Sequence, residues 1–467
     1  MMRVILLLFL TTLNMVGVAQ NYFNNNYEYH SKVANATAIV ETDSGYIFTS
    51  CIYASGYNSF LIVQIGLNGD TAWTKEYQDT LHSFSTGTSN SIIKTSDSNY
   101  VFCGSRLDAT NNRDAWLVKF DPNGDTLWTR SYGGGSFDNA NVVCQAPDTG
   151  FVLMGTTKSF SAGPASDFYL IKTDKNGIQQ WQQVYGTTAS EDCVSGQITL
   201  DGGFILSGRK SNMFHIVKTD ANGGFQWQQT YSGTIDVCFI KQLTDSSYIL
   251  TGSKTVTGLG FQACILKVNS SGALIWQKTY GGNLDDWFYS QAVTLNDGSI
   301  ITAGQSISGS IPIGLLVKTD SLGNLQWLRK YFKNPIGDNY FYDVKSTSDN
   351  GFIMSGFALV ATSDPWVVKV DEFGCEVANC SVGVNEFQIS NSKLILYPNP
   401  ANNEITLQIS DLNISDAEIQ VINGLGEFQQ FQISDSKINI SNFNAGVYFM
   451  VVTFKDGQRL TEKFLKQ

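Results

Sequence analysis

The chain has 467 residues and a formal net charge of −11. Charged residues make up 15% and aromatic residues 12%, with 43 glycines, which is typical of an all-β protein with many tight turns and excludes a disordered chain. Basic blocks are absent from the sequence, which excludes binding to the nucleic-acid backbone and attachment to a membrane surface through a polybasic segment.

The first twenty residues, MMRVILLLFLTTLNMVGVAQ, have the three parts of a secretory signal peptide. Arg3 provides the positive start, Val4 to Leu13 the short apolar stretch, and Gly17-Val18-Ala19 a small-residue cleavage site. We therefore predict that residues 1–19 are removed on export. No apolar stretch is long enough to span a bilayer, so we expect no transmembrane segment.

Two phrases then alternate along the chain. One is represented by VKFDPNGDTLW, in which a Trp follows the glycine of an Asp-x-x-Gly turn by four residues. The other is represented by SDSNYVFCG, and both phrases occur seven times. The turn glycines are Gly69, Gly124, Gly177, Gly223, Gly272, Gly323 and Gly374.

Each repeat reads as four short strands. In the second repeat the predicted strands are Ser91–Thr95, Tyr100–Arg106, Ala115–Asp121 and Leu127–Gly133, separated by turn residues at hairpin distance. Four strands at a period of about 50 residues are typical of a propeller blade. We therefore predict a seven-bladed β-propeller over residues 20–380, in which the repeated Trp and the Tyr four residues later pack between blades. A lysine repeated in the third strand is expected to have a scaffold role.

The seventh repeat lacks its fourth strand, because no Trp follows Gly374 by four residues. The missing spacing occurs near the N-terminus, where Phe23 and Tyr27 of FNNNY stand as the Trp and Tyr do elsewhere. We expect this segment to supply the outer strand of the last blade. Such closure removes the open edges of a linear stack of sheets.

After Cys380 the repeats end. Residues 381–392 are predicted to be a linker, and residues 393–467 have alternating strands sufficient for a small C-terminal β-sandwich. The motifs of this tail are Tyr397-Pro398-Asn399-Pro400, VINGLGE, NAGVYFMVV with Gly446 and Tyr448, and a basic last strand with Lys463. In this combination the tail resembles the C-terminal sorting domain of the Bacteroidetes type IX secretion system.

That resemblance implies a route and a partner. The N-terminal signal leads to the periplasm, and the type IX secretion machinery then recognises the tail, carries the protein across the outer membrane and usually removes the tail. The residues implied in the sorting signal are Pro398, Asn399, Pro400, Gly446, Tyr448 and Lys463. We therefore expect the protein to be secreted or held on the outer cell surface.

Few residues suggest chemistry. The chain has three histidines, and it lacks a His-x-x-x-His pattern, a nucleophile elbow and a phosphate-binding glycine loop, so we predict no metal, no cofactor and no catalytic residue. Cys375 and Cys380 bracket the end of the propeller and are predicted to form a local disulfide. The other six cysteines lie among strand residues and are expected to be buried apolar groups.

The connection that enters each blade is the best candidate surface for a ligand. It carries acids beside aromatics, a combination that suits glycan or cation binding on a propeller face. The alternative reading is that the acids cap turns and the aromatics pack. The candidate ligand-binding residues are Asp138, Asp285, Asp286, Trp287, Asp338 and Asp343.

Two classes of function follow from this surface. The favoured prediction is a non-enzymatic protein that binds a glycan or a surface protein. The alternative is a secreted glycan-degrading enzyme with acid pairs at the channel mouth, for which Asp285/Asp286 and Asp338/Asp343 are the candidates. Evenly repeated blades favour binding, because a catalytic site usually breaks the repeat in which it lies.

Overall fold

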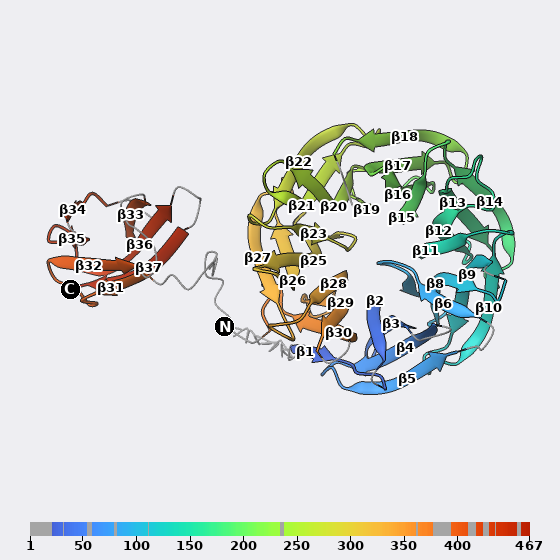
Figure 1. Ribbon diagram of the computed structural model, residues 1–467, viewed down its shortest axis with the longest axis horizontal. Helices are drawn as coiled ribbons and strands as arrows, with labels where there is room; N and C mark the ends of the chain where they lie inside the picture. The colour runs from blue at the N-terminus through green and yellow to red at the C-terminus, as the bar shows by residue number, and fades with distance from the viewer. Residues whose placement is uncertain are drawn as a thin grey trace, which may run out of the picture. The chain divides into compact units, whose positions relative to one another are not determined.

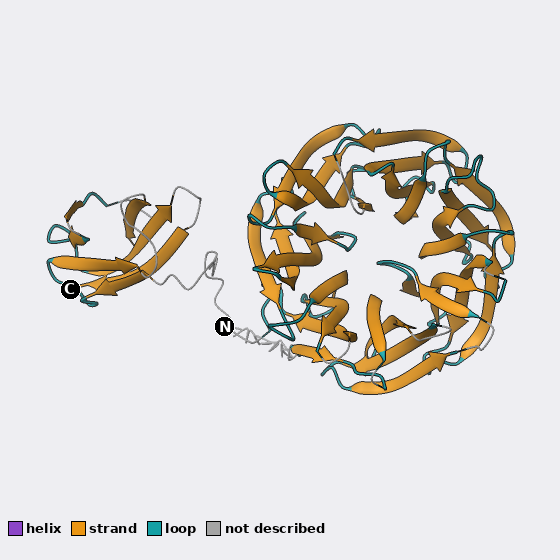
Figure 2. Ribbon diagram, viewed as in Figure 1, coloured by secondary structure: helices purple, strands orange, loops and turns teal. Residues whose placement is uncertain are grey.

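The computed structural model describes residues 21–376 and 394–467. Within these ranges it leaves out residue 31 and residues 54–57, 79–81, 111, 234–237, 361–362, 410–416, 424–428, 435 and 455–458. All of its regular elements are β-strands (Figure 2). The chain divides into two compact units between Val382 and Gly383. The predicted signal peptide, the linker and Cys380 lie outside the described residues.

The first unit contains seven antiparallel sheets arranged as a ring, so the predicted all-β propeller is confirmed (Figure 1). Blade 1 contains β2 (Val33–Thr42), β3 (Gly45–Tyr53), β4 (Ser59–Gly66) and β5 (Thr71–Tyr77). Blade 2 contains β6 (Ser83–Thr86), β7 (Ile92–Lys94), β8 (Tyr100–Leu107), β9 (Arg113–Phe120) and β10 (Thr126–Tyr132). Blade 3 contains β11 (Asp138–Gln145), β12 (Phe151–Thr157), β13 (Asp167–Thr173) and β14 (Gln179–Tyr185).

The remaining blades follow the same order, with the first strand innermost and the last outermost. Blade 4 contains β15 (Glu191–Ile198), β16 (Phe204–Lys210), β17 (Met213–Thr219) and β18 (Phe225–Tyr231). Blade 5 contains β19 (Cys238–Gln242), β20 (Tyr248–Val256), β21 (Gly260–Val268) and β22 (Leu274–Tyr280). Blade 6 contains β23 (Asp286–Phe288), β24 (Val293–Thr294), β25 (Ile300–Ser308), β26 (Ile311–Thr319) and β27 (Leu325–Tyr331).

Blade 7 joins the two ends of the propeller. It contains β28 (Asn339–Ser346), β29 (Phe352–Leu359) and β30 (Ser363–Val370), and its outermost strand is β1 (Phe23–Asn26). The pairing is antiparallel, with Phe23 opposite Lys369 and Asn26 opposite Trp366. In Figure 1 the blue β1 accordingly lies beside the orange β30.

The repeated Trp and Tyr pack between blades as predicted. The Tyr132 hydroxyl donates to the carbonyl of Gly177 in the next blade at 2.7 Å. Gly177 has a φ of +74°, and a Cβ there would lie 2.8 Å from the Trp128 ring, so both its conformation and its contact require glycine. The same hydroxyl-to-glycine bond recurs at Tyr27–Gly69, Tyr77–Gly124, Tyr185–Gly223, Tyr231–Gly272, Tyr280–Gly323 and Tyr331–Gly374.

The lysine repeated in the third strand has the expected scaffold role. Lys172, for example, is buried and forms an ion pair of 2.6 Å with Asp148 in the turn between the first two strands. Four further blades have the same pair, at Lys119–Asp97, Lys218–Asp201, Lys267–Asp245 and Lys369–Asp349. Each buried ammonium is therefore neutralised within its own blade.

The cysteines that the structure describes form two groups, one disulfide-bonded residue and six free thiols. Cys375 is disulfide-bonded, while its predicted partner Cys380 lies outside the described residues. The other six are free thiols, and all are buried except the half-buried Cys144. Burial raises the pKa of these thiols, for instance to about 12 at Cys264, which keeps them protonated and unreactive.

The second unit is the small β-sandwich. One sheet contains β31 (Leu394–Tyr397), β32 (Glu404–Ile409), β34 (Gln432–Ser434) and β35 (Lys437–Asn439). The other contains β33 (Ala417–Asn423), β36 (Gly446–Phe454) and β37 (Arg459–Lys466). Leu396 and Ile405 of the first sheet pack in one core with Met450 and Phe464 of the second, so this unit has a core of its own.

Candidate ligand-binding site

The innermost strands of the propeller start at one face of the ring, which we call the entry face because the connections between consecutive blades lie there. Side chains alternate along each of these strands. In β28, for example, Phe341 is fully buried between blades, while its neighbours Tyr340 and Tyr342 are half-buried and therefore turn toward the ring axis. This alternation gives an inner strand two axis-facing positions near the entry face.

Strand pairing places these residues at common levels. The glycine that ends the phrase SDSNYVFCG and its repeats, for example Gly155 in blade 3, serves as a common reference. The residue paired with the position just after this glycine defines the upper level. It is Asn139 in blade 3, Asp192 in blade 4, Trp287 in blade 6 and Tyr340 in blade 7. Asn35 and Ser85 hold this position in blades 1 and 2. The lower level, two residues on, contains Thr37, Asn141, Val194, Tyr289 and Tyr342.

Blades 6 and 7 form what we call the aromatic wall, which consists of Trp287, Tyr289, Tyr340 and Tyr342. Tyr289 and Tyr342 contact each other across the two blades, with ring centroids 6.0 Å apart. Trp287 stacks on Phe261 at 5.7 Å and Tyr340 stacks on Phe357 at 4.7 Å, so the rings are fixed by packing. Burial raises the pKa of Tyr340 and of Tyr342, which keeps both phenols protonated at neutral pH.

Blades 3 and 4 form the polar wall, which consists of Asn139, Asn141, Asp192 and Arg209. These side chains line a cavity of about 350 Å³ together with Phe137 and Thr156. Asn141 donates to the carbonyl of Cys193 at 2.6 Å. Arg209 Nε lies 3.3 Å from Asp192, and these side chains are 41% and 36% exposed, so the pair remains open to a ligand.

A segment of blade 2, residues 87–91, spans the ring axis below these two walls; we call it the plug. The amide of Thr88 donates to the carbonyl of Asn141 at 3.0 Å, and its hydroxyl donates to the carbonyl of Val194 at 2.7 Å. On the other side, Asn90 donates to Gln291 of blade 6 at 2.6 Å. In Figure 1 this blue loop, beside β6 and β8, extends toward the middle of the ring.

Sequence reasoning missed the plug, and Gly87 was the available signal. A Cβ at Gly87 would lie 2.5 Å from the carbonyl oxygen of Asn141, which only glycine avoids. The segment GTSN interrupts the inner strand where β6 ends and β7 begins. Such an interruption of polar residues in one repeat indicates a local insertion.

Asp138 and Asp286 are buried at the starts of two inner strands. Asp138 accepts hydrogen bonds from the hydroxyl of Thr157, the hydroxyl of Ser159 at 2.6 Å and the amide of Gly134 at 2.9 Å. Asp286 accepts from the amide of Gly282 at 3.0 Å, and burial raises its pKa. Both carboxyls therefore hold the connections of the entry face in place.

The other predicted site residues occupy different positions. Asp285 accepts from the amide of Phe261 at 2.7 Å, and Asp338 is half-buried beside Tyr340. Asp343 is fully buried below the aromatic wall, where it binds the plug hydroxyl of Ser89, two backbone amides and, at 2.6 Å, the Lys345 ammonium. Trp287 alone among the six candidates belongs to the aromatic wall.

Neither acid pair proposed for an enzyme lines the cavity at the polar wall. Asp338 immediately precedes β28 and Asp343 lies on it, five residues later. At the rise of a β-strand their Cα atoms are roughly 16 Å apart. Glycosidases need their two carboxyls within about 10 Å. Asp285 and Asp286 are adjacent, and each binds a different backbone amide.

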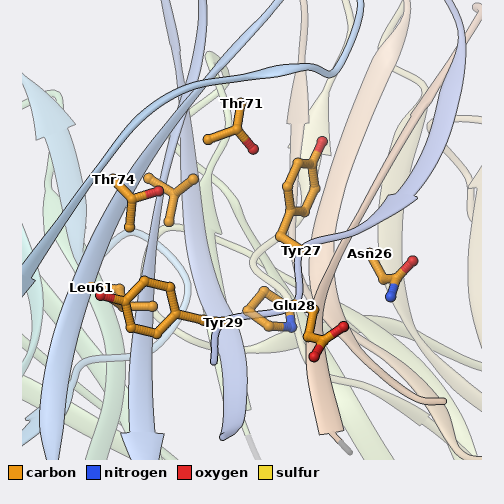
Figure 3. Close-up of a pocket in the computed structure, with 9 residues that line it drawn as sticks. Asn26, Tyr27, Glu28, Tyr29, Leu61, Thr71 and Thr74 are labelled. Atoms are coloured by element: carbon orange, nitrogen blue, oxygen red, sulfur yellow. The ribbon is translucent and has the colours of Figure 1, made fainter. Parts of the chain in front are cut away.

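A second cavity, of about 260 Å³, lies where the ring closes (Figure 3). Its lining includes Asn26 to Tyr29 of the N-terminal segment and Leu61, Thr71 and Thr74 of blade 1. Tyr27 donates to the carbonyl of Gly69 at 2.8 Å and Tyr29 donates to Glu76 at 3.0 Å. Its phenols are thus used in closing the ring.

Other kinds of site are absent from the part of the chain that the structure describes. No three His, Cys, Asp or Glu residues there come together as metal ligands. His215 is buried, donates to or accepts from Thr230 at 2.9 Å, and has its pKa lowered to about 4 by burial, so it is a packing residue. The described residues also include no helix of the length and apolarity needed to cross a membrane.

The tail matches a known family over residues 395–467, described as a secretion system C-terminal sorting domain. The C-terminal sandwich is a sorting domain. Such domains mark proteins that the type IX system secretes to the cell surface or the extracellular space, and this is the protein's destination. No curated protein matches the chain significantly.

The residues implied in the sorting signal lie mainly along one edge of the sandwich. Asn399, between Pro398 and Pro400, donates to the carbonyl of Lys463 and accepts from the amide of Leu465, both at 2.9 Å. Gly446 begins β36, opposite Lys466. The Tyr448 ring is buried against Phe464. The opening turn of the sorting domain is therefore fixed to its last strand.

Solved structures resemble the chain only distantly. A protein of unknown function from Dyadobacter fermentans is 10% identical with a TM-score of 0.42, covering 65% of this chain and 97% of its own. The extracellular domain of a predicted hybrid two-component system from B. thetaiotaomicron is 11% identical with a TM-score of 0.40, covering 95% and 60%. The β-propeller domain of the Trilobed protease from Pyrococcus furiosus is 8% identical with a TM-score of 0.37, covering 83% and 94%.

Proposed function

We propose that the protein is a non-enzymatic binding protein of the cell surface or medium, which holds a glycan at the entry face between the aromatic wall and the polar wall. One observation carries this proposal. In blades 1 to 4 the side chains at the axis-facing positions are Asn, Asp, Ser, Thr or Val. In blades 6 and 7 the same positions hold four aromatic residues, Trp287, Tyr289, Tyr340 and Tyr342. The repeat is broken here by aromatic side chains and not by acids, which favours contact with a ligand over catalysis.

The chemistry of the two walls suits a sugar. Aromatic rings held at half exposure offer flat apolar surfaces for the C–H faces of a pyranose, and their hydroxyls add hydrogen bonds. Across the axis, Asn139, Asp192 and Arg209 offer donors and acceptors for sugar hydroxyls. A few placed polar groups beside an apolar surface are what a small-molecule site requires. The plug supports a binding role, because it gives this region a floor.

A glycan array with the full mature chain, followed by titration of the best ligand, tests the proposal. We expect Trp287→Ala and Tyr340→Ala each to weaken binding by about tenfold or more, since each removes a stacking surface. Phe225→Ala is the matched control, because Phe225 is 57% exposed on the outer strand β18. Equal affinity in all three variants would contradict the proposal.

The enzyme alternative has its own outcome in this experiment. Turnover of a bound glycan that Asp285→Ala or Asp338→Ala abolishes, with binding retained, would favour the degrading enzyme. Binding without turnover would favour the proposal. If no glycan on the array binds and a surface protein binds instead, the protein remains a binding protein but its ligand is a protein.

A further inference from the structure

On the far side of the plug from the entry face, the inner strands present another ring of axis-facing residues. Each of them pairs with the residue three positions before the glycine that ends the phrase SDSNYVFCG or its repeats, so they share one level. This set contains Val40, Ile93, Cys144, Gln197, Lys241, Val293 and Lys345. It includes two lysines and no acid.

Lys345 already has a partner and Lys241 has none. Lys345 binds Asp343 at 2.6 Å. Lys241 follows the fully buried Ile240 on β19, so it turns toward the axis, and among the described residues it has no hydrogen-bond or ion-pair partner. Its pKa is lowered, first because burial disfavours the cation and then because Lys345 repels it.

This arrangement departs from the rest of the propeller. Elsewhere the fold neutralises a buried lysine with an aspartate of the same blade, as at Lys172 and Lys218. Lys241 has no such aspartate partner among the described residues, and the carboxylate that neutralises Lys345, Asp343, is buried and already accepts from Lys345, Ser89 and two amides. Two ammonium groups and one carboxylate leave one positive charge uncompensated in a partly buried place.

We propose that Lys241 and Lys345 form a binding site for an oxyanion at the axis of the ring, on the side of the plug away from the glycan. A sulfate, phosphate or carboxylate there accepts hydrogen bonds from both ammonium groups and supplies the charge that the fold does not. The plug separates this site from the entry face, so the anion enters from the opposite face. Its source is either a free ion or the charged group of a larger ligand.

Titration of the full mature chain with inorganic sulfate and with a sulfated monosaccharide, at constant ionic strength, tests this site. We expect binding to the wild-type chain, weakened roughly ten- to a hundredfold by Lys241→Met, because one charge-assisted hydrogen bond is lost. Lys278→Met is the control, since Lys278 lies on the outer strand β22 and donates a hydrogen bond to Asn324 there instead of facing the axis. Trp287→Ala must leave this binding unchanged, which separates it from the glycan site.

The outcomes are distinct. Binding of both probes indicates a free oxyanion, and binding of the sulfated sugar alone indicates a charged group on a larger ligand. Lys241→Met should fold with undiminished stability in chloride, because it removes an unpaired cation, whereas Lys172→Met breaks a buried ion pair and should be destabilised. Equal sulfate affinity in the wild type and Lys241→Met, or no binding of either probe, would overturn the proposal.

Discussion

Asp167 and Glu191 meet beneath Gly186, where blades 3 and 4 join. Both carboxyl groups are buried, and a Cβ at Gly186 would lie 2.0 Å from Asp167 Oδ1. Glu191 accepts from the Thr187 hydroxyl at 2.6 Å and from Lys210 at 2.9 Å, and these partners lower its pKa although burial opposes them. Burial, and then the charge of Glu191, raises the pKa of Asp167. Burial and the neighbouring charge of Glu191 therefore both favour the protonated form of Asp167.

This pair predicts a specific dependence of stability on pH. The contribution of Asp167 is complete below the ordinary pKa of an aspartate, and it is lost as pH rises through the raised pKa of Asp167, because the folded state must then release the proton. Asp167→Asn keeps a donor toward Glu191 at all pH values, so we expect it to remove this loss. Unfolding free energies measured across that pH range, with the exposed Asp70→Asn as control, check it. A wild-type slope retained in Asp167→Asn would show that the raised pKa of Asp167 does not cause it.

Residues of the candidate site differ in how well the sequence predicts them. Trp287 was found because it is an aromatic residue beside acids in an entry connection. Asn139 and Arg209 were not found, because their relation to the aromatic wall runs across the axis and has no local signature. Asp138 and Asp286 were candidates for a ligand on the basis of their loops. The structure places them in hydrogen bonds to those loops, which a spacing argument does not distinguish from exposure.

At the scale of elements, β1 and the plug differ in how far the sequence predicts them. The spacing of Phe23 and Tyr27 is that of the Trp and Tyr in the other six blades, and Tyr27 makes the same hydrogen bond to a turn glycine. Periodicity is therefore enough to find β1. The plug occurs once and depends on contacts with blades 3, 4, 6 and 7, so no period reveals it.

Phe23→Ala should destabilise the whole ring. The ring of Phe23 is buried against Gly69 and Tyr46, and its removal leaves a cavity in the closing contact. We expect a loss of about 3 kcal/mol in the free energy of unfolding, the usual value for a buried phenylalanine. Hydrogen exchange of the β30 amides should become faster, and that of blade 4 should change less. Asn21→Ala, just before β1, is the control, and unchanged exchange in β30 would contradict the role of β1.

At the scale of the whole molecule, the propeller and the sorting domain each have a separate core. Ending the chain after Ser392 should therefore leave a folded propeller that accumulates in the periplasm, because the tail that addresses it is missing. Cell fractionation of the truncated and full chains measures this. Normal delivery of the truncated chain to the surface would show that the tail does not direct export.

The pairing of β1 with β30 also sets an order of events. β1 is the first strand of the propeller in chain order, and its partner β30 is separated from it by nearly the whole propeller. Contacts between such distant segments form slowly, because a long loop must close before any of them is made. Until β30 arrives, both strands are open edges that can pair with other chains. The period between entry into the periplasm and closure of the ring is therefore when this protein most needs a chaperone.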